Sequence, residues 1–136
     1  MRTTPENITS LESDQIFVFG SNLAGIHGKG AAKLAFDKFG ASFRDGFGLR
    51  MQSYAIPTKG FNLDILSIDT IRLFIRLFIH TAKYKPHLTF FVTKVGCGLA
   101  GYKPEDIAPL FKDAMKLENV YLPIEFWDVL INKTKQ

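Results

Sequence analysis

The sequence predicts an α/β fold in which a mixed, mostly parallel sheet carries helices on both faces. Short apolar runs rich in β-branched and aromatic residues alternate along the chain with longer segments of helical periodicity. Two of the apolar runs end abruptly in glycine-rich segments that lead into a helix. This alternation is typical of three layers, with the sheet in the middle.

Length and composition are those of one globular domain. The chain has 136 residues, of which 46% are hydrophobic, and its 13 Phe are ample for one continuous core. We expect a single domain over residues 1–136. Residues 1–14 are polar and show little periodicity, so we expect them to form a loosely ordered lead-in.

Composition argues against several classes of protein. No run of eighteen apolar residues and no N-terminal export signal is present, so we expect a cytoplasmic protein with no membrane partner. One cysteine, Cys97, excludes an internal disulfide and a multi-cysteine metal site. The net charge of +4 comes from 17 Lys and Arg against 13 Asp and Glu. Because the basic residues are spread out, a nucleic-acid-binding accessory protein is only an alternative function.

The first predicted strand, Gln15–Phe19, feeds a glycine-rich loop that runs from Gly20 to Gly30 and precedes a helix ending at Gly40. Ligands bind at this edge of α/β sheets, because loops converge there and helix N-termini offer N–H groups to anions. The spacing is neither the dinucleotide fingerprint nor a P-loop. Alternatively, the glycines only build turns. The candidate ligand-binding residues of this loop are Gly20, Ser21, Asn22, His27, Gly28 and Gly30.

Two polar side chains of this loop suit a nucleotide. The amide of Asn22 both donates and accepts hydrogen bonds, which fits a ribose hydroxyl or a base edge. His27 is a candidate for contact with phosphate or for ribose chemistry. Since no second ligand lies near it in sequence, we expect no metal site and no cofactor.

The middle of the chain predicts a strand over Ser53–Ile56, closed by Pro57, and a helix over Ile68–Lys83. Lys59 follows the strand and is placed to reach the ligand edge. Leu73 and Leu77 lie on the flank of the helix, where they either pack on a neighbouring helix or mark a partner surface. The predicted inward face comprises Ile71, Phe74, Ile75, Phe78, Ile79 and Ala82.

A second strand, Thr89–Val95, runs into another glycine-rich loop, Gly96–Gly101, and Pro104 is well placed to begin the next helix. Two such loops at one sheet edge would hold both phosphates of a diphosphate. A short strand over Val120–Leu122 and a helical turn or two over Ile124–Leu130 complete the chain. The candidate residues of the second loop are Gly96, Cys97, Gly98, Leu99, Ala100, Gly101 and Tyr102.

Three side chains near the second loop have a structural explanation beside the functional one. Cys97 is a small apolar filler or a nucleophile. Tyr102 is an ordinary loop aromatic or a ring that stacks on the ligand. Asp106 is a partner of the helix dipole or a catalytic carboxylate.

Taken together, these segments resemble macrodomains. FGSNLAGIHGKGAAKLAFDKFGA resembles their first ligand loop and helix, and VGCGLAGYKPEDIAPLF resembles their second phosphate loop. The combination of IPTK with VGCGL is similar to the branch that includes terminal ADP-ribose protein glycohydrolase and ADP-ribose phosphatases. The whole pattern is also similar to a small macrodomain-like family of phages and bacteria.

The resemblance implies a three-layer macrodomain-like fold that binds ADP-ribose. It places Gly28, Gly30 and Ala31 near the proximal phosphate and ribose, and Asn22 at the distal ribose. In the glycohydrolase branch a lysine attacks the ribose, a role that Lys59 matches, and an aspartate after GCGL resolves the adduct. Ala100 stands at that place here, which leaves Asp106 as the candidate acid.

We therefore expect a protein that binds ADP-ribose or a related nucleotide diphosphate and hydrolyses ADP-ribosyl conjugates. The alternative from another class is a reader or sequestering module that binds ADP-ribose without turnover, which the alanine at position 100 favours.

Overall fold

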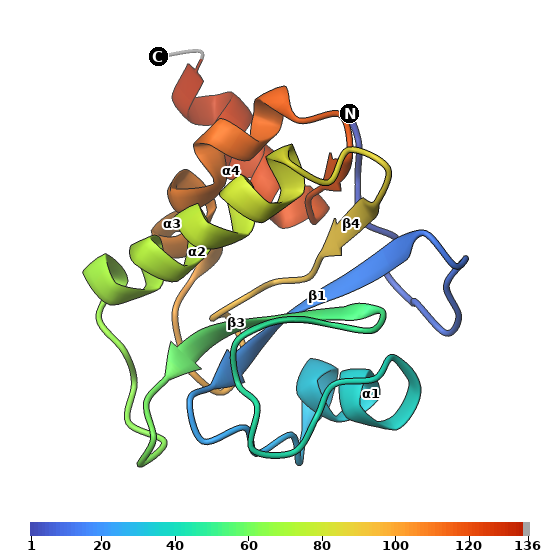
Figure 1. Cartoon of the computed structure of the whole chain (residues 1–136). Helices are drawn as coiled ribbons and strands as arrows, with labels where there is room; N and C mark the ends of the chain where they lie inside the picture. The colour runs from blue at the N-terminus through green and yellow to red at the C-terminus, as the bar shows by residue number, and fades with distance from the viewer. Residues whose placement is uncertain (135–136) are drawn as a thin grey trace.

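The computed structural model describes residues 1–134 and confirms the α/β fold (Figure 1). The sheet has the order β2-β3-β1-β4-β5, in which only β2 runs antiparallel to its neighbour. The strands are β1 (Gln15–Asn22), β2 (Gly48–Arg50), β3 (Ser53–Lys59), β4 (Thr89–Val92) and β5 (Val120–Tyr121). The helices are α1 (Gly30–Lys38), α2 (Ile68–Lys83), α3 (Pro104–Ile107), the 3-10 helix η1 (Ala108–Lys116) and α4 (Ile124–Thr134).

Helices cover both faces of the sheet. Helix α1 lies on one face, and α2, α3 and α4 lie on the other, as Figure 1 shows. β1 is central, because it pairs in parallel with β3 on one side and with β4 on the other. Successive residues of a strand point to opposite faces, so β1 contributes Phe17 to the α1 side and Val18 to the other side.

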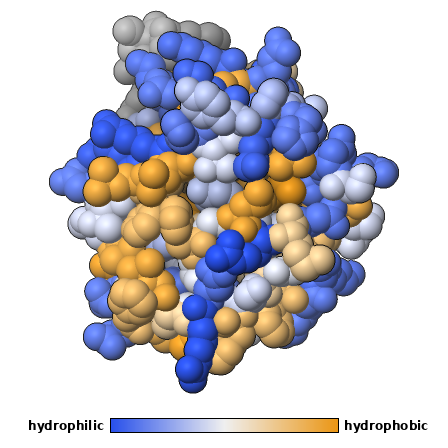
Figure 2. Space-filling view, in the orientation of Figure 1, coloured by the Kyte–Doolittle hydropathy of each residue, from blue (hydrophilic) through white to orange (hydrophobic). Residues whose placement is uncertain are grey.

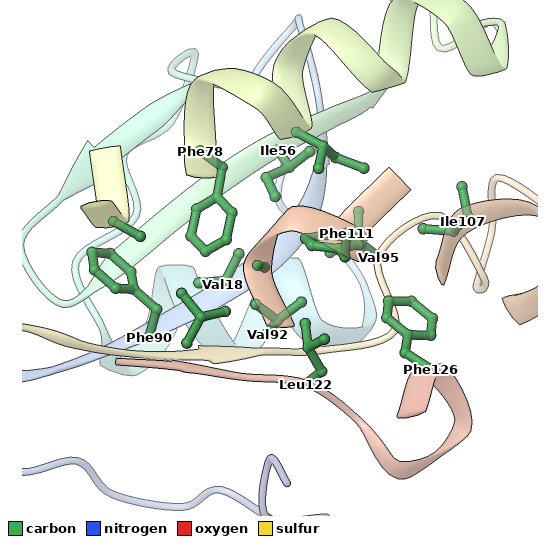
Figure 3. Packing of buried hydrophobic residues seen from close by; sticks show 14 of the residues in the cluster. Val18, Ile56, Phe78, Phe90, Val92, Val95, Ile107, Phe111, Leu122 and Phe126 are labelled. Atoms are coloured by element: carbon green, nitrogen blue, oxygen red, sulfur yellow. The ribbon is translucent and has the colours of Figure 1, made fainter. Parts of the chain in front are cut away.

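The larger core lies between the sheet and α2, η1 and α4 (Figure 3). Phe78 of α2 is completely buried, and its ring centroid lies 5.5 Å from that of Phe90 and 6.2 Å from that of Phe111. The smaller core packs α1 against Phe17 and Phe19. Burying β1 on both faces fixes its register, because a slip by one residue would exchange the two cores.

Helix α2 has the predicted bounds and the predicted inward face. Its 16 residues carry the apolar positions at helical spacing, and the hydroxyl of Ser67 accepts a hydrogen bond from the N–H of Thr70 at 3.2 Å, which fixes the first turn. Leu73 and Leu77 are exposed. They therefore do not pack on a neighbouring helix.

Two strand boundaries differ from the prediction. β3 continues through Pro57 to Lys59, although proline lacks an N–H. β2 pairs with β3 only over Ser53–Ala55, so Pro57 lies where the β2 side of β3 is unpaired and no sheet hydrogen bond is lost. β4 ends at Val92, three residues earlier than expected, and the chain then turns tightly, with the N–H of Val95 donating to the carbonyl of Thr93 at 2.7 Å.

The N-terminal segment is not a loose lead-in at its start. Thr3 pairs with Leu122 beside β5, and the hydroxyl of buried Thr4 donates to the carbonyl of Val92 at 2.7 Å. The guanidinium of Arg2 donates to the carbonyls of Val120 and Met115. The polar sequence suggested a loose segment, but these residues use their polar groups in long-range hydrogen bonds.

Across residues 1–134 we find no helix that is long and apolar enough to cross a membrane.

Candidate functional site

The carboxyl ends of β1, β3 and β4 meet at one edge of the sheet, where the predicted ligand loops begin. A Cβ on Gly20, in β1, would lie 3.2 Å from the backbone nitrogen of Gly96 and 3.7 Å from the methyl group of Thr58 in β3. The hydroxyl of Thr58 donates to the carbonyl of Ser21 at 3.2 Å. The two glycine loops therefore begin side by side, as the sequence predicts.

The first loop is held by the amide of Asn22. Its Nδ2 donates to the carbonyl of Ile26 at 2.8 Å, and its Oδ1 accepts the N–H of Ile26 at 2.9 Å. Both ends of the amide are thus engaged within the loop. Asn22 therefore shapes the loop, and its amide keeps one N–H and one lone pair beyond these two bonds.

A neighbouring segment, residues 42–46, supports the first loop. The hydroxyl of Ser21 donates to the carbonyl of Gly46, and Arg44 donates its N–H to the carbonyl of Gly25 at 2.9 Å. Gly25 has φ of +70° and lies so close to Asp45 that no side chain fits there. The turn at Gly25 therefore requires glycine for reasons internal to the chain.

His27 is buried between the first loop and segment 42–46. Its side chain is 5% exposed, and its Nε2 lies 2.9 Å from the carbonyl oxygen of Ser42 and 3.2 Å from that of Asp45. Two carbonyl acceptors require Nε2 to carry the proton. Nδ1 is buried without a partner, and the ring packs against Phe19 and Phe36. His27 holds the loop in place and does not face solvent.

Unpaired backbone N–H groups follow directly after His27. Within the described chain, the N–H groups of residues 27–32 have no hydrogen-bond acceptor. Lys29 caps α1 without a side-chain hydrogen bond. Gly28, Lys29 and Gly30 are exposed, and Ala31 is half-buried. The N-terminus of α1 thus offers several donors and the positive end of a helix dipole to an anion.

The second loop has a similar character. Three of its N–H groups are used internally, since Cys97 donates to the carbonyl of Lys94, Gly101 to that of Gly98, and Tyr102 to that of Gly96. The N–H groups of residues 98–100 have no acceptor in the part of the chain that the structure describes. These three consecutive donors suit a phosphate. Leu99 is 70% exposed, whereas Ala100 is buried.

Tyr102 links the second loop to the segment before α2. Its hydroxyl donates to the carbonyl of Leu66 at 2.6 Å, and its ring packs against the larger core. Tyr102 therefore connects the second loop to the segment before α2.

Cys97 has the properties of an inert filler. The thiol is half-buried and lies 3.6 Å from the carbonyl oxygen of Val95. Burial raises the pKa of Cys97 to about 11; Lys94 opposes this rise, and the carboxylates of Asp106, Glu105 and Glu125 each add a smaller upward effect. A thiol that stays protonated at neutral pH is a poor nucleophile.

Lys59 and Asp106, the two proposed catalytic residues, form no ion pair with each other. Asp106 caps α3, because its Oδ2 accepts the N–H of Lys103 at 3.0 Å. Lys59, at the end of β3, is half-buried and forms no ion pair within residues 1–134. Among the described residues no cluster of His, Cys, Asp and Glu could hold a metal ion.

Asp64 is an acidic residue that the sequence did not single out. The β3–α2 loop folds back on itself, with the N–H of Gly60 donating to the carbonyl of Asp64 at 2.8 Å. An oxygen of the Asp64 carboxylate lies 2.6 Å from the place where a Cβ on Gly60 would be. The turn therefore brings a carboxylate next to the residue that follows Lys59, which spacing alone did not reveal.

Gly28 and Gly98 have no structural reason to be glycine. A Cβ on either residue would meet no heavy atom within 4 Å, and neither has a positive φ. The other loop glycines differ, because Gly25, Gly30, Gly96 and Gly101 have positive φ and Gly20 lies against Gly96. In each loop, therefore, one glycine is not required by packing or by backbone conformation.

We find no match for this chain among protein-family models, curated proteins or solved structures. The resemblance to macrodomains therefore stays a prediction based on the two loops.

The difference between the glycines is testable through stability. A Cβ on Gly46 would overlap the carbonyl oxygen of Asn22, so we expect Gly46→Ala to lower the free energy of unfolding by about 1–3 kcal/mol. Gly28→Ala should change it by less than about 0.5 kcal/mol, because the added methyl group enters open space. Urea unfolding of both variants measures this, and equal losses would contradict the packing of segment 42–46 on the first loop.

The raised pKa of Cys97 predicts slow alkylation. At pH 8 iodoacetamide should react with the folded protein roughly a hundredfold more slowly than with the unfolded chain, because the reactive thiolate is scarce below its pKa. The rate should rise with pH until about pH 11. Mass spectrometry over a pH series measures the rate, and a rate that already levels off above about pH 9 would show an ordinary, accessible thiol.

Proposed function

We propose that the two glycine loops bind the diphosphate of a nucleotide, and that ADP-ribose is the ligand. The observation that carries this proposal is the pair Gly28 and Gly98, which neither packing nor backbone conformation requires. Glycine at such positions lets a ligand approach the backbone closely. Both residues lie in loops that leave the carboxyl ends of adjacent parallel strands, where α/β sheets bind ligands.

The unpaired N–H groups support the same ligand. Residues 27–32 and 98–100 leave donors free on each loop, and a diphosphate has enough acceptor oxygens to engage both sets. Lys29 is exposed beside the first set of donors and adds positive charge. Lys94, near the second set in sequence, is exposed but pairs with Glu125 at 3.8 Å. Asn22, which the resemblance assigns to the distal ribose, and His27, a candidate because of its place in the loop, contribute by fixing the shape of the first loop.

Whether binding leads to turnover depends on Lys59. A lysine that attacks the ribose needs an acidic residue whose carboxylate later accepts a proton from water, so that the water releases the product. Asp106 caps α3, which favours a reader that binds ADP-ribose without hydrolysis. Asp64, whose carboxylate lies against Gly60, favours a hydrolase instead, with Lys59 as the nucleophile and Asp64 as the acid.

Calorimetric titration with ADP-ribose tests the binding proposal. We expect saturable binding of ADP-ribose, with higher affinity than for AMP or NAD. In the variant Gly98→Glu the affinity for ADP-ribose should fall by at least about tenfold, because a carboxylate would repel the diphosphate. Lys112→Glu is the control, since Lys112 is exposed on η1. An unchanged affinity in Gly98→Glu would remove the second loop from the site. Oligonucleotide binding that falls steeply with salt, without ADP-ribose binding, would favour the nucleic-acid alternative.

Turnover of an ADP-ribosylated protein separates the hydrolase from the reader. If the protein is a hydrolase of the lysine type, Lys59→Ala and Asp64→Asn should each lower kcat by at least about a hundredfold, while ADP-ribose still binds. Activity that survives Lys59→Ala would rule out the lysine adduct. Binding with no release of ADP-ribose by the unaltered protein would establish the reader.

A further inference from the structure

The outer face of α2 carries an exposed apolar stripe. Leu73 is 58% exposed, Leu77 is 49% exposed and Tyr84, which ends the helix, is 67% exposed. The opposite face of α2 packs against the core. The exposed apolar residues on its outer face therefore do not contribute to the core. Figure 2 has the orientation of Figure 1. It shows a group of hydrophobic residues on the part of the surface where α2 begins in Figure 1, with hydrophilic residues beside it.

The spacing of the stripe matches a helical partner. Leu73, Leu77, His80 and Tyr84 follow one another at intervals of four, three and four residues, which is the spacing of a coiled-coil seam. The rings of His80 and Tyr84 lie 4.7 Å apart and form one continuous surface at the end of the helix. A stripe of this width accommodates one helix packed along α2.

The charge beside the stripe is basic. Arg72, Arg76 and Lys83 share one flank of the helix. Arg72 pairs with Asp69, but Arg76 and Lys83 form no ion pair within the described residues. The other flank carries Thr70 and Thr81, which are uncharged. A complementary partner is therefore acidic along one side of its own apolar stripe.

A second copy of the chain does not have this complementarity. In an antiparallel pair related by a two-fold axis, the same flank of each helix meets its counterpart. Arg76 and Lys83 would then face the same cations of the other copy, which is unfavourable. In a parallel pair the basic flank would meet Thr70 and Thr81, which offer no countercharge.

A lipid surface or a nucleic acid also fits less well. Membrane-surface helices use a broad apolar face with basic residues at its borders, whereas this stripe is narrow and basic on one side only. Nucleic acids are bound through phosphate contacts and aromatic stacking. Leu73 and Leu77, at the centre of the stripe, would take part in neither.

We propose that the outer face of α2, formed by Leu73, Leu77, His80 and Tyr84 with Arg76 and Lys83 beside them, docks an acidic amphipathic helix of another protein. The apolar side chains interdigitate along the seam, and the acidic flank of the partner neutralises the two unpaired cations. This docking is independent of the ligand loops, because it uses the outward face of α2.

The test uses the full-length protein and designed peptides of the length of α2. The probe has leucines at the four-three-four spacing and glutamates along one flank. Its controls are a scrambled peptide and a peptide with lysine in place of glutamate. We expect saturable binding of the acidic peptide alone, with NMR shift changes confined to residues 66–85. Arg76→Glu and Leu73→Ser should each weaken it by about tenfold, whereas Lys38→Glu, on α1, should not.

A charge exchange keeps the test specific. Arg76→Glu should gain affinity for the lysine peptide, which excludes loss of folding as the cause of weaker binding to the acidic one. Equal binding of the scrambled peptide, or no binding of the acidic peptide at millimolar concentration, would overturn the proposal. So would tighter binding to phosphatidylserine vesicles or to duplex DNA, or a dimer in sedimentation that Leu73→Ser abolishes.

Discussion

The structure depends on the burial of β1 on both faces and its pairing along both edges. Its apolar residues alternate between two cores, and parallel pairing with β3 and β4 brings three carboxyl ends to the same edge. The loops that follow these strands are therefore neighbours as a consequence of topology. Gly20 makes the contact between them close, because a side chain at the end of β1 would press on the backbone of Gly96.

Elements with a strong local signal were predictable from the sequence. Helix α2 has the expected bounds, because the spacing of its apolar residues and the N-capping residue Ser67 both belong to the segment itself. Features set by distant partners were not. β3 passes through Pro57 because β2 is short, and residues 2–4 are ordered because β5 lies beside them. The residues after Ile107 continue as a 3-10 helix, which apolar spacing does not distinguish from an α-helix.

For the candidate site, the sequence identified the loops better than the roles of their side chains. Glycines between a strand and a helix are a local pattern, and the structure places both loops at one edge. The polar side chains were assigned to a ligand, yet Asn22, His27 and Tyr102 satisfy backbone groups of the chain itself. Two of these partners, Ser42 and Leu66, lie far away in sequence. Asp64 was missed because the turn that carries it is folded against Gly60.

The pairing of residues 2–4 with β5 also bears on self-association through the sheet. An open strand at the edge of a sheet is a template for adding strands from other molecules. At this edge Thr3 pairs with Leu122 and Thr4 donates its N–H to the carbonyl of Leu122, and Pro5, the next residue, cannot donate a backbone hydrogen bond. At the opposite edge β2 is only three residues long. The sheet thus ends at both sides in segments that disfavour edge-to-edge aggregation.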